Sequence, residues 1–144
     1  MKKTDLLITS CTKSSYINAK LEKILGDIFV DDLTSRQALI MLTLQQQPNA
    51  SMKDIQEILG MSQQTTASQF NKLKVNKLIS VVRDEIDSRI KRVNLEPCAL
   101  DILSKNENNI EYESNKIIDL EKIEEDLCKI EYLLNERLER NKNK

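Results

Sequence analysis

The polar side chains between residues 63 and 72 are the first in this 144-residue chain whose types and spacing suggest a chemistry. Thr66 (through its methyl group), Phe70 and Leu73 follow helical spacing and define one apolar face. Amides off that face can pair with adenine in a major groove, while hydroxyl and ammonium groups reach phosphates or guanine. The pattern predicts a helix that contacts double-stranded DNA through Gln63, Gln64, Thr65, Ser68, Asn71 and Lys72.

A second group of charged residues lies some fifteen positions further along. Arg89 falls near the tip of a predicted hairpin, where a guanidinium can enter a neighbouring minor groove. Asp87, two residues earlier, can hold that guanidinium by an ion pair. Lys91 adds a further cation. We expect these three residues to form a second DNA contact.

The elements that must position these groups begin with two short helices. Ser51 and Asp54 form an N-cap signature, and the helix that follows carries Ile55, Ile58 and Leu59 on one face. Gly60 is a natural helix stop, and Ser62 can cap the next helix. Two short helices joined by such a turn predict a helix-turn-helix.

Longer elements flank this motif. A helix is predicted over residues 5–30, and Thr34 with Gln37 forms a capping box that opens another, running to about Gln46. Residues 78–83 and 90–95 are strand-like on either side of a polar turn, which predicts a hairpin. Pro97 can start a helix over 97–110.

The last predicted helix runs from Glu111 to about Arg140. Its apolar residues recur in steps of three and four, nearly as in a coiled coil. Such a seam needs another long helix, either the first helix of this chain or a second copy. The predicted dimer interface comprises Ile17, Leu21, Ile117, Leu120, Ile123, Leu127, Ile130 and Leu134, with Leu138 one turn later.

The formal charge of −1 conceals an uneven distribution. Residues 61–95 hold seven basic and three acidic residues, a net charge of +4. Residues 96–144 hold eight basic and thirteen acidic residues, a net charge of −5. A DNA backbone attracts the first segment and repels the second.

The composition excludes several functions. There is no histidine, which removes the usual nucleophile–base pairs and histidine zinc sites, so no enzyme activity, metal or cofactor is expected. Three separated cysteines with no CxxC spacing favour reduced thiols in the cytoplasm. The longest apolar run near the N-terminus, Leu6 to Ile8, is too short for a signal or a membrane span.

Residues 33–95 resemble the winged helix-turn-helix core of the MarR-type transcriptional regulators. The matching elements are Leu33-Thr34-x-x-Gln37, Ile55-x-x-Ile58-Leu59-Gly60-Met61-Ser62, Thr65, Leu73, Leu78-Ile79, Asp87-x-Arg89 and Leu95. Two positions depart from the pattern. Lys77 stands where the family usually has glycine, and Glu96-Pro97 stands where it usually has threonine and a glycine-containing helix start.

The resemblance implies a mainly α fold with a small β-hairpin wing and long N- and C-terminal dimerisation helices. It divides the chain into a dimerisation helix (1–32), a winged DNA-binding domain (33–95) and C-terminal dimerisation helices (96–144). It also implies a homodimeric repressor on a pseudo-palindromic operator, released by a small-molecule effector or an oxidant. Some family members sense peroxide through a cysteine in the first helix, where this chain has Cys11.

Two functions from different classes therefore compete. The first is a dimeric transcriptional regulator that binds double-stranded DNA. The second is a helical protein-interaction adaptor that dimerises through its coiled-coil-like C-terminal helix. An adaptor has no need for positive charge confined to residues 61–95, so the charge distribution favours the first.

Overall fold

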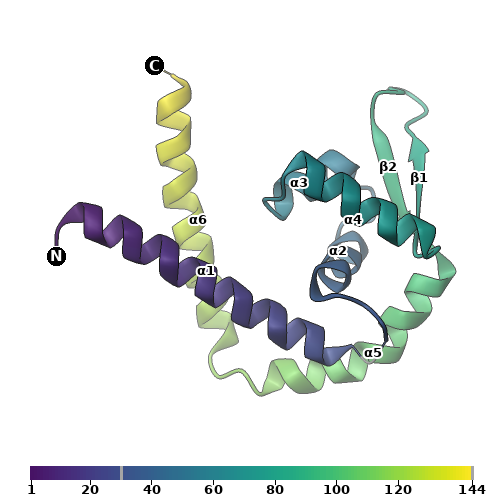
Figure 1. Ribbon diagram of the computed structural model, residues 1–144, viewed down its shortest axis with the longest axis horizontal. Helices are drawn as coiled ribbons and strands as arrows, with labels where there is room; N and C mark the ends of the chain where they lie inside the picture. Colours follow the sequence, from purple (N-terminus) through teal and green to yellow (C-terminus); the bar gives the residue numbers. More distant parts are fainter. Residues whose placement is uncertain (30, 144) are drawn as a thin grey trace. The chain divides into compact units, whose positions relative to one another are not determined.

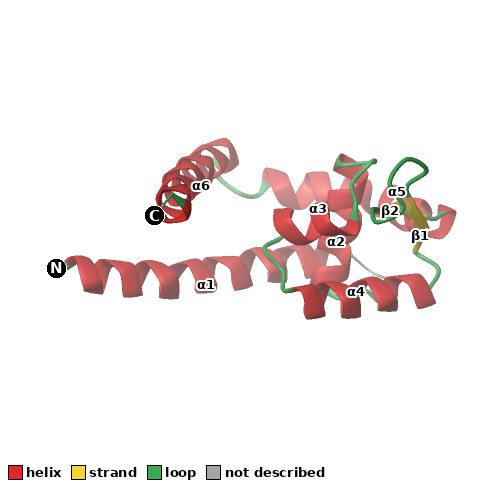
Figure 2. Cartoon of the chain, turned by 90° about the horizontal axis from the view of Figure 1, so that it is seen from above, coloured by secondary structure: helices red, strands yellow, loops and turns green. Residues whose placement is uncertain are grey.

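The computed structural model describes residues 1–29 and 31–143, which form a mainly helical fold with one antiparallel hairpin, as predicted (Figure 1). In chain order the elements are α1 (Lys3–Ile28), α2 (Ser35–Gln46), α3 (Met52–Ile58), α4 (Gln63–Val75), β1 (Ile79–Arg83), β2 (Lys91–Leu95), α5 (Pro97–Asn115) and α6 (Leu120–Lys142). Short loops join them (Figure 2). The final residue of the predicted first helix, Val30, lies outside the described residues.

Two compact units make up the chain, residues 1–110 and residues 111–144. This division follows contacts within one chain, so the proposed division at 32 and 95 stays a prediction. None of the described helices is long and apolar enough to cross a membrane.

Local capping explains where the central helices begin. The Thr34 hydroxyl accepts from the Gln37 amide at 3.1 Å, and the Gln37 side chain accepts from the Thr34 amide at 3.1 Å. Ser51 and Asp54 form the same reciprocal pair at the start of α3. Both capping boxes satisfy backbone donors that a helix leaves unpaired. The predicted starts of α2 and α3 are therefore confirmed.

Both helices of the turn motif end in a left-handed residue. Gly60, after α3, has φ of 60°, and Lys77, after α4, has φ of 59°. After α4 the Leu78 amide donates to the Leu73 carbonyl at 2.9 Å, and the Lys77 amide to the Lys74 carbonyl at 3.0 Å. This pair of bonds is a Schellman motif, whose left-handed position favours glycine. Lys77, which stands where the family usually has glycine, therefore occupies the left-handed position of this motif.

The hairpin is attached to the body of unit 1. β1 and β2 pair from Ile79 opposite Leu95 to Arg83 opposite Lys91. The Val93 amide also donates to the Ala50 carbonyl at 3.3 Å, in the loop between α2 and α3. Val93 itself is buried. The hairpin base is thus fixed against the helix-turn-helix.

The core lies among α2, α3, α4 and the hairpin base, with the end of α1 and the start of α5 closing it. Its fully buried large apolar residues are Ile40, Met41, Ile55, Phe70, Leu73 and Val93. Ile58 was predicted on the apolar face of α3 but is 54% exposed, and Ile55 is the one residue of that helix that is buried.

The break between the last two helices was predicted in the wrong place. Glu111 lies inside α5, which continues to Asn115, and α6 begins only at Leu120. Ile117 therefore falls in the intervening turn and not on α6. No glycine or proline marks this break. Asn115, the last residue of α5, is of a type that disfavours helix interiors, because its side chain can compete for backbone hydrogen bonds. Asp119 adopts the left-handed conformation that a short polar residue tolerates (φ 56°).

Candidate nucleic-acid interface

α4 presents two different faces. Thr66, Phe70 and Leu73 are at most 2% exposed and pack into the core. The Ser62 hydroxyl accepts from the Thr65 amide at 3.1 Å and donates to the Thr65 hydroxyl at 2.8 Å, which fixes the first turn. All six predicted contact residues are exposed: Gln63, Gln64, Thr65, Ser68, Asn71 and Lys72. Their faces are confirmed, while contact with DNA stays a prediction.

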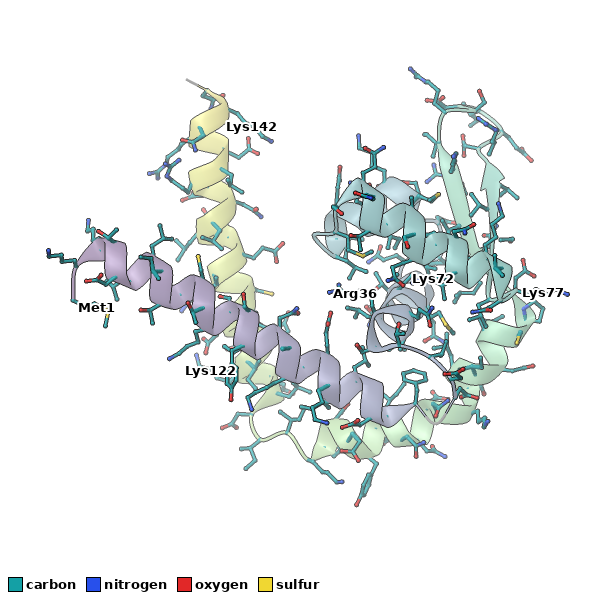
Figure 3. All side chains as sticks on the ribbon, in the orientation of Figure 1. Met1, Arg36, Lys72, Lys77, Lys122 and Lys142 are labelled. Atoms are coloured by element: carbon teal, nitrogen blue, oxygen red, sulfur yellow. The ribbon has the colours of Figure 1, made fainter. Side chains whose placement is uncertain are left out.

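Figure 3 labels two cations at the C-terminal half of this helix. Lys72 projects from α4, and Lys77 from the turn that follows. Both are exposed. Positive charge therefore continues beyond the end of α4.

The ion pair predicted at the wing is present. The Arg89 guanidinium donates to both carboxylate oxygens of Asp87, at 3.0 Å from Nε and 3.1 Å from Nη2. The Arg89 side chain is nevertheless 89% exposed. These hydrogen bonds hold the pKa of Asp87 below its ordinary value and raise that of Arg89. A bidentate pair restricts the guanidinium while leaving its outer edge open to a ligand.

A hollow of about 290 Å³ separates α4 from the hairpin. Its lining includes the apolar Phe70 and Val81 and the cations Lys74, Arg83 and Lys91, and no acidic residue. Lys91 is among the predicted contact residues, whereas Lys74 and Arg83 were not named. The charge count over residues 61–95 included both, but it could not show that they line the same hollow.

A larger groove, about 870 Å³, runs between α3, the start of α4 and the hairpin. Gln63 lines it from α4, and Arg89 and Lys91 line it from the hairpin. The structure therefore brings the two predicted contact groups onto one surface of unit 1. That surface is called the basic face below, and it comprises the exposed side of α4 together with the hairpin cations Arg83, Arg89 and Lys91.

The remaining predicted residues lie elsewhere. Cys11 is exposed on α1, and Cys98 and Cys128 are exposed as well. The Cys128 thiol donates to Glu124, and that hydrogen bond raises its pKa. A redox role for Cys11 stays a prediction. Among the described residues no cluster of cysteine and carboxylate side chains could hold a metal ion.

The predicted dimer residues are exposed in the single chain, except Ile117, which is half-buried. Exposure is 43% for Ile17 and 37% for Leu21 on α1. On α6 it rises from 37% at Ile123 to 58% at Leu134, and no described residue of α6 is buried. The exposed apolar residues of the α6 seam are Leu120, Ile123, Leu127, Ile130, Leu134 and Leu138.

Comparison with known proteins places these features in context. The MarR family model matches residues 31–90, which span α2, the turn motif and most of the wing. No curated protein sequence matches the chain.

Solved structures share the fold at low identity. The transcriptional regulator BldR from Sulfolobus solfataricus is 20% identical, with a TM-score of 0.72 over 90% of this chain and 97% of its own. AbfR of Staphylococcus epidermidis is 16% identical, with a TM-score of 0.78 over 95% and 96%. A mutant of MarR from E. coli, complexed with operator DNA, is 13% identical, with a TM-score of 0.66 over 96% and 99%.

At these identities the solved structures establish the fold, and the family model matches most of the segment that carries the basic face. Residues 31–90 thus match the MarR family model, within a chain that shares the winged helix-turn-helix fold of solved MarR-type regulators.

Proposed function

We propose that this chain is a transcriptional regulator that binds double-stranded DNA sequence-specifically as a homodimer, acting as a repressor on a pseudo-palindromic operator. The observation that carries the proposal is the basic face: a capped helix with six exposed polar contact residues beside a wing arginine held by a carboxylate. MarR from E. coli, which shares the fold, was solved with operator DNA. In this function the chain acts beside the chromosome in the cytoplasm and performs no reaction.

The two parts of the basic face contribute differently. α4 lies in the major groove, where its amides and hydroxyls distinguish base pairs. Arg89 enters the adjacent minor groove, where negative potential is greatest at narrow A·T-rich sequence. The lysines that surround these groups bind phosphates, which adds affinity without sequence preference.

The homodimer follows from the open apolar faces. α6 carries six exposed seam residues, and α1 leaves Ile17 and Leu21 exposed. A second copy supplies the same faces, so the contact is self-complementary. Two wings related by a two-fold axis then fit two half-sites of a pseudo-palindrome.

Binding to duplexes enriched from a random-sequence pool tests the proposal. We expect enrichment of an inverted repeat, and an affinity for it that falls steeply with salt, because bound lysines and arginines displace counterions. Lys72→Ala should weaken binding to all duplexes and reduce the salt slope by about one. Lys129→Ala, an exposed cation on α6, is the matched control and should leave binding unchanged. Absence of duplex binding at low salt would reject the DNA-binding function and favour the alternative, a helical protein-interaction adaptor.

Release by an oxidant through Cys11 is a finer part of the proposal. AbfR, which shares the fold, was solved bound to DNA in reduced and in overoxidized form. We expect peroxide to weaken DNA binding by the wild-type chain but not by Cys11→Ser. If peroxide changes DNA binding equally in the two proteins, Cys11 is not the sensor, and a small-molecule effector is left as the route of release.

A further inference from the structure

The wing arginine is connected to the body of the winged domain by a continuous series of polar contacts. The series begins in the loop between α2 and α3, where the Asn49 carbonyl accepts from Arg92 Nη1 at 2.8 Å. Arg92 Nε donates to Asp84 Oδ1 at 3.2 Å. The Arg92 and Asp84 side chains are 36% and 22% exposed, so both are partly withdrawn from water.

The second oxygen of Asp84 continues the series toward the tip. Asp84 Oδ2 accepts from the Ile86 amide at 3.1 Å and from the Asp87 amide at 3.0 Å. Asp87 in turn accepts the Arg89 guanidinium with both carboxylate oxygens. One carboxylate therefore fixes the turn that carries the other, and that other carboxylate fixes the arginine.

We propose that Asp84 and Arg92 are positioning residues that hold Arg89 in the orientation needed for the minor groove, acting through Asp87. The inference rests on the proposed DNA-binding function and adds to it a set of residues that need not touch DNA. Arg89 is too exposed for its ion pair to contribute much to folding stability. Holding it before contact reduces the side-chain entropy lost on binding, so the effect belongs to affinity.

The negative charge of Asp84 allows a test, because electrostatics and positioning predict opposite changes in DNA affinity when that charge is removed. Asp84 is a carboxylate on a face that binds a polyanion, so simple electrostatics predicts that removing it strengthens DNA binding. Positioning predicts the opposite for a specific duplex, because Arg89 loses its fixed orientation. The hydrogen bonds from Asp87 and Arg92 also hold the pKa of Asp84 below its ordinary value, so its charge is present at neutral pH.

Glu85 is the matched control. It is the next residue and carries the same charge, but it is exposed and has no hydrogen bond or ion pair among the described residues. The test measures affinity of Asp84→Ala and Glu85→Ala for two probes: the duplex that the wild-type chain enriches, and a scrambled duplex of equal length and composition. We expect Glu85→Ala to bind both as well as wild type or more tightly. Asp84→Ala should bind the enriched duplex about tenfold more weakly and the scrambled one no more weakly.

Coupling to Arg89 separates positioning from general loosening of the wing. In an Arg89→Ala background the Asp84→Ala change should weaken binding to the enriched duplex no further, since the residue it positions is gone. Additive losses, or an Asp84→Ala variant that behaves like Glu85→Ala, would overturn the inference. If Asp84→Ala lowers the melting temperature, Asp84→Asn replaces it and must meet the same coupling criterion.

Arg92 is tested in the same way by Arg92→Met, which keeps an unbranched side chain. Positioning predicts weaker binding to the enriched duplex alone. Weaker binding to both probes with a smaller salt slope would instead make Arg92 a phosphate contact and overturn its part of the inference. A wild-type chain that enriches no sequence contradicts the proposed function itself, which is a distinguishable failure.

Discussion

α4 and α6 are both amphipathic helices, yet only the apolar face of α4 is buried in the single chain. α4 buries Thr66, Phe70 and Leu73 against the core of unit 1. α6 has a longer apolar seam, but no described residue of that helix is buried. The apolar face of α4 is therefore covered by contacts within unit 1, whereas the seam of α6 is left exposed. Changes in the two helices should consequently differ in how their effects depend on protein concentration.

The largest expected effect comes from the core face of α4. Phe70→Ala removes a ring that is 2% exposed, and should lower the free energy of unfolding by about 3–5 kcal/mol. Urea unfolding at two protein concentrations measures it, and the loss should be the same at both. Ser68→Ala, on the exposed face of the same helix, is the control, with an expected change of under about 0.5 kcal/mol. Similar losses for both variants would contradict the assignment of faces.

Substitutions in the α6 seam should weaken dimer association without unfolding the winged domain. Leu127→Asp places a carboxylate in the predicted dimer contact and should cost about 3 kcal/mol of association free energy, roughly a hundredfold in dissociation constant. Sedimentation equilibrium measures the shift toward monomer. Lys129→Asp introduces the same group on the opposite side of α6 and should leave the dimer intact. If the wild-type chain is already a monomer, the predicted dimer contact on α6 is wrong.

Lys77 offers a change that should stabilise the winged domain. An ordinary side chain at φ of 59° is strained, and glycine relieves that strain. Lys77→Gly should raise the free energy of unfolding by about 0.5–1 kcal/mol without altering association. Lys77→Ala removes the same charge but keeps the Cβ atom, so it should give no gain. Equal gains from both variants would assign the effect to charge and not to the backbone.

The smallest expected effect concerns Asp31, which joins the segment before α2 to α5. Asn106, fully buried, donates to Asp31 at 3.0 Å, and Lys105 lies 3.3 Å away. These contacts hold the pKa of Asp31 below its ordinary value of 3.8. The stabilisation is present above that value and is lost as the pH falls through the lowered pKa.

Asp31→Asn should therefore lose less stability than wild type when the pH is lowered from about 5 to about 3. Urea midpoints across that range measure the difference. Asp32→Asn, the exposed neighbour, should follow the wild-type curve. A common curve for all three proteins would mean that the Asn106 contact does not favour the ionised carboxyl.

Local signals predicted the winged domain well. The capping boxes of α2 and α3 each lie within four residues, so the sequence displays both partners at once. Gly60 and Ser62 likewise mark a helix end and a helix start. The exposed polar face of α4 followed from the spacing of Phe70 and its apolar neighbours. The contact of these residues with DNA still rests on a proposal.

Long-range or unmarked features were missed. The α5–α6 break has no glycine or proline, and the sequence pattern placed it at residue 111 although α5 continues to Asn115. The contact of Arg92 with Asn49 joins residues 43 positions apart. Lys74 and Arg83 line one hollow only because the hairpin returns beside α4. No local pattern contains such pairs.

The sequence by itself determined the helix-turn-helix, the hairpin and the segregation of charge, because caps, spacing and residue type are local properties. It also supplied the Asp87–Arg89 pair, whose members are two residues apart. Only the tertiary structure decided that the wing arginine is connected through Asp84 and Arg92 to the loop before α3, because folding alone brings these residues within hydrogen-bond distance. It likewise decided which apolar residues the single chain buries, since burial depends on the neighbours that the fold provides.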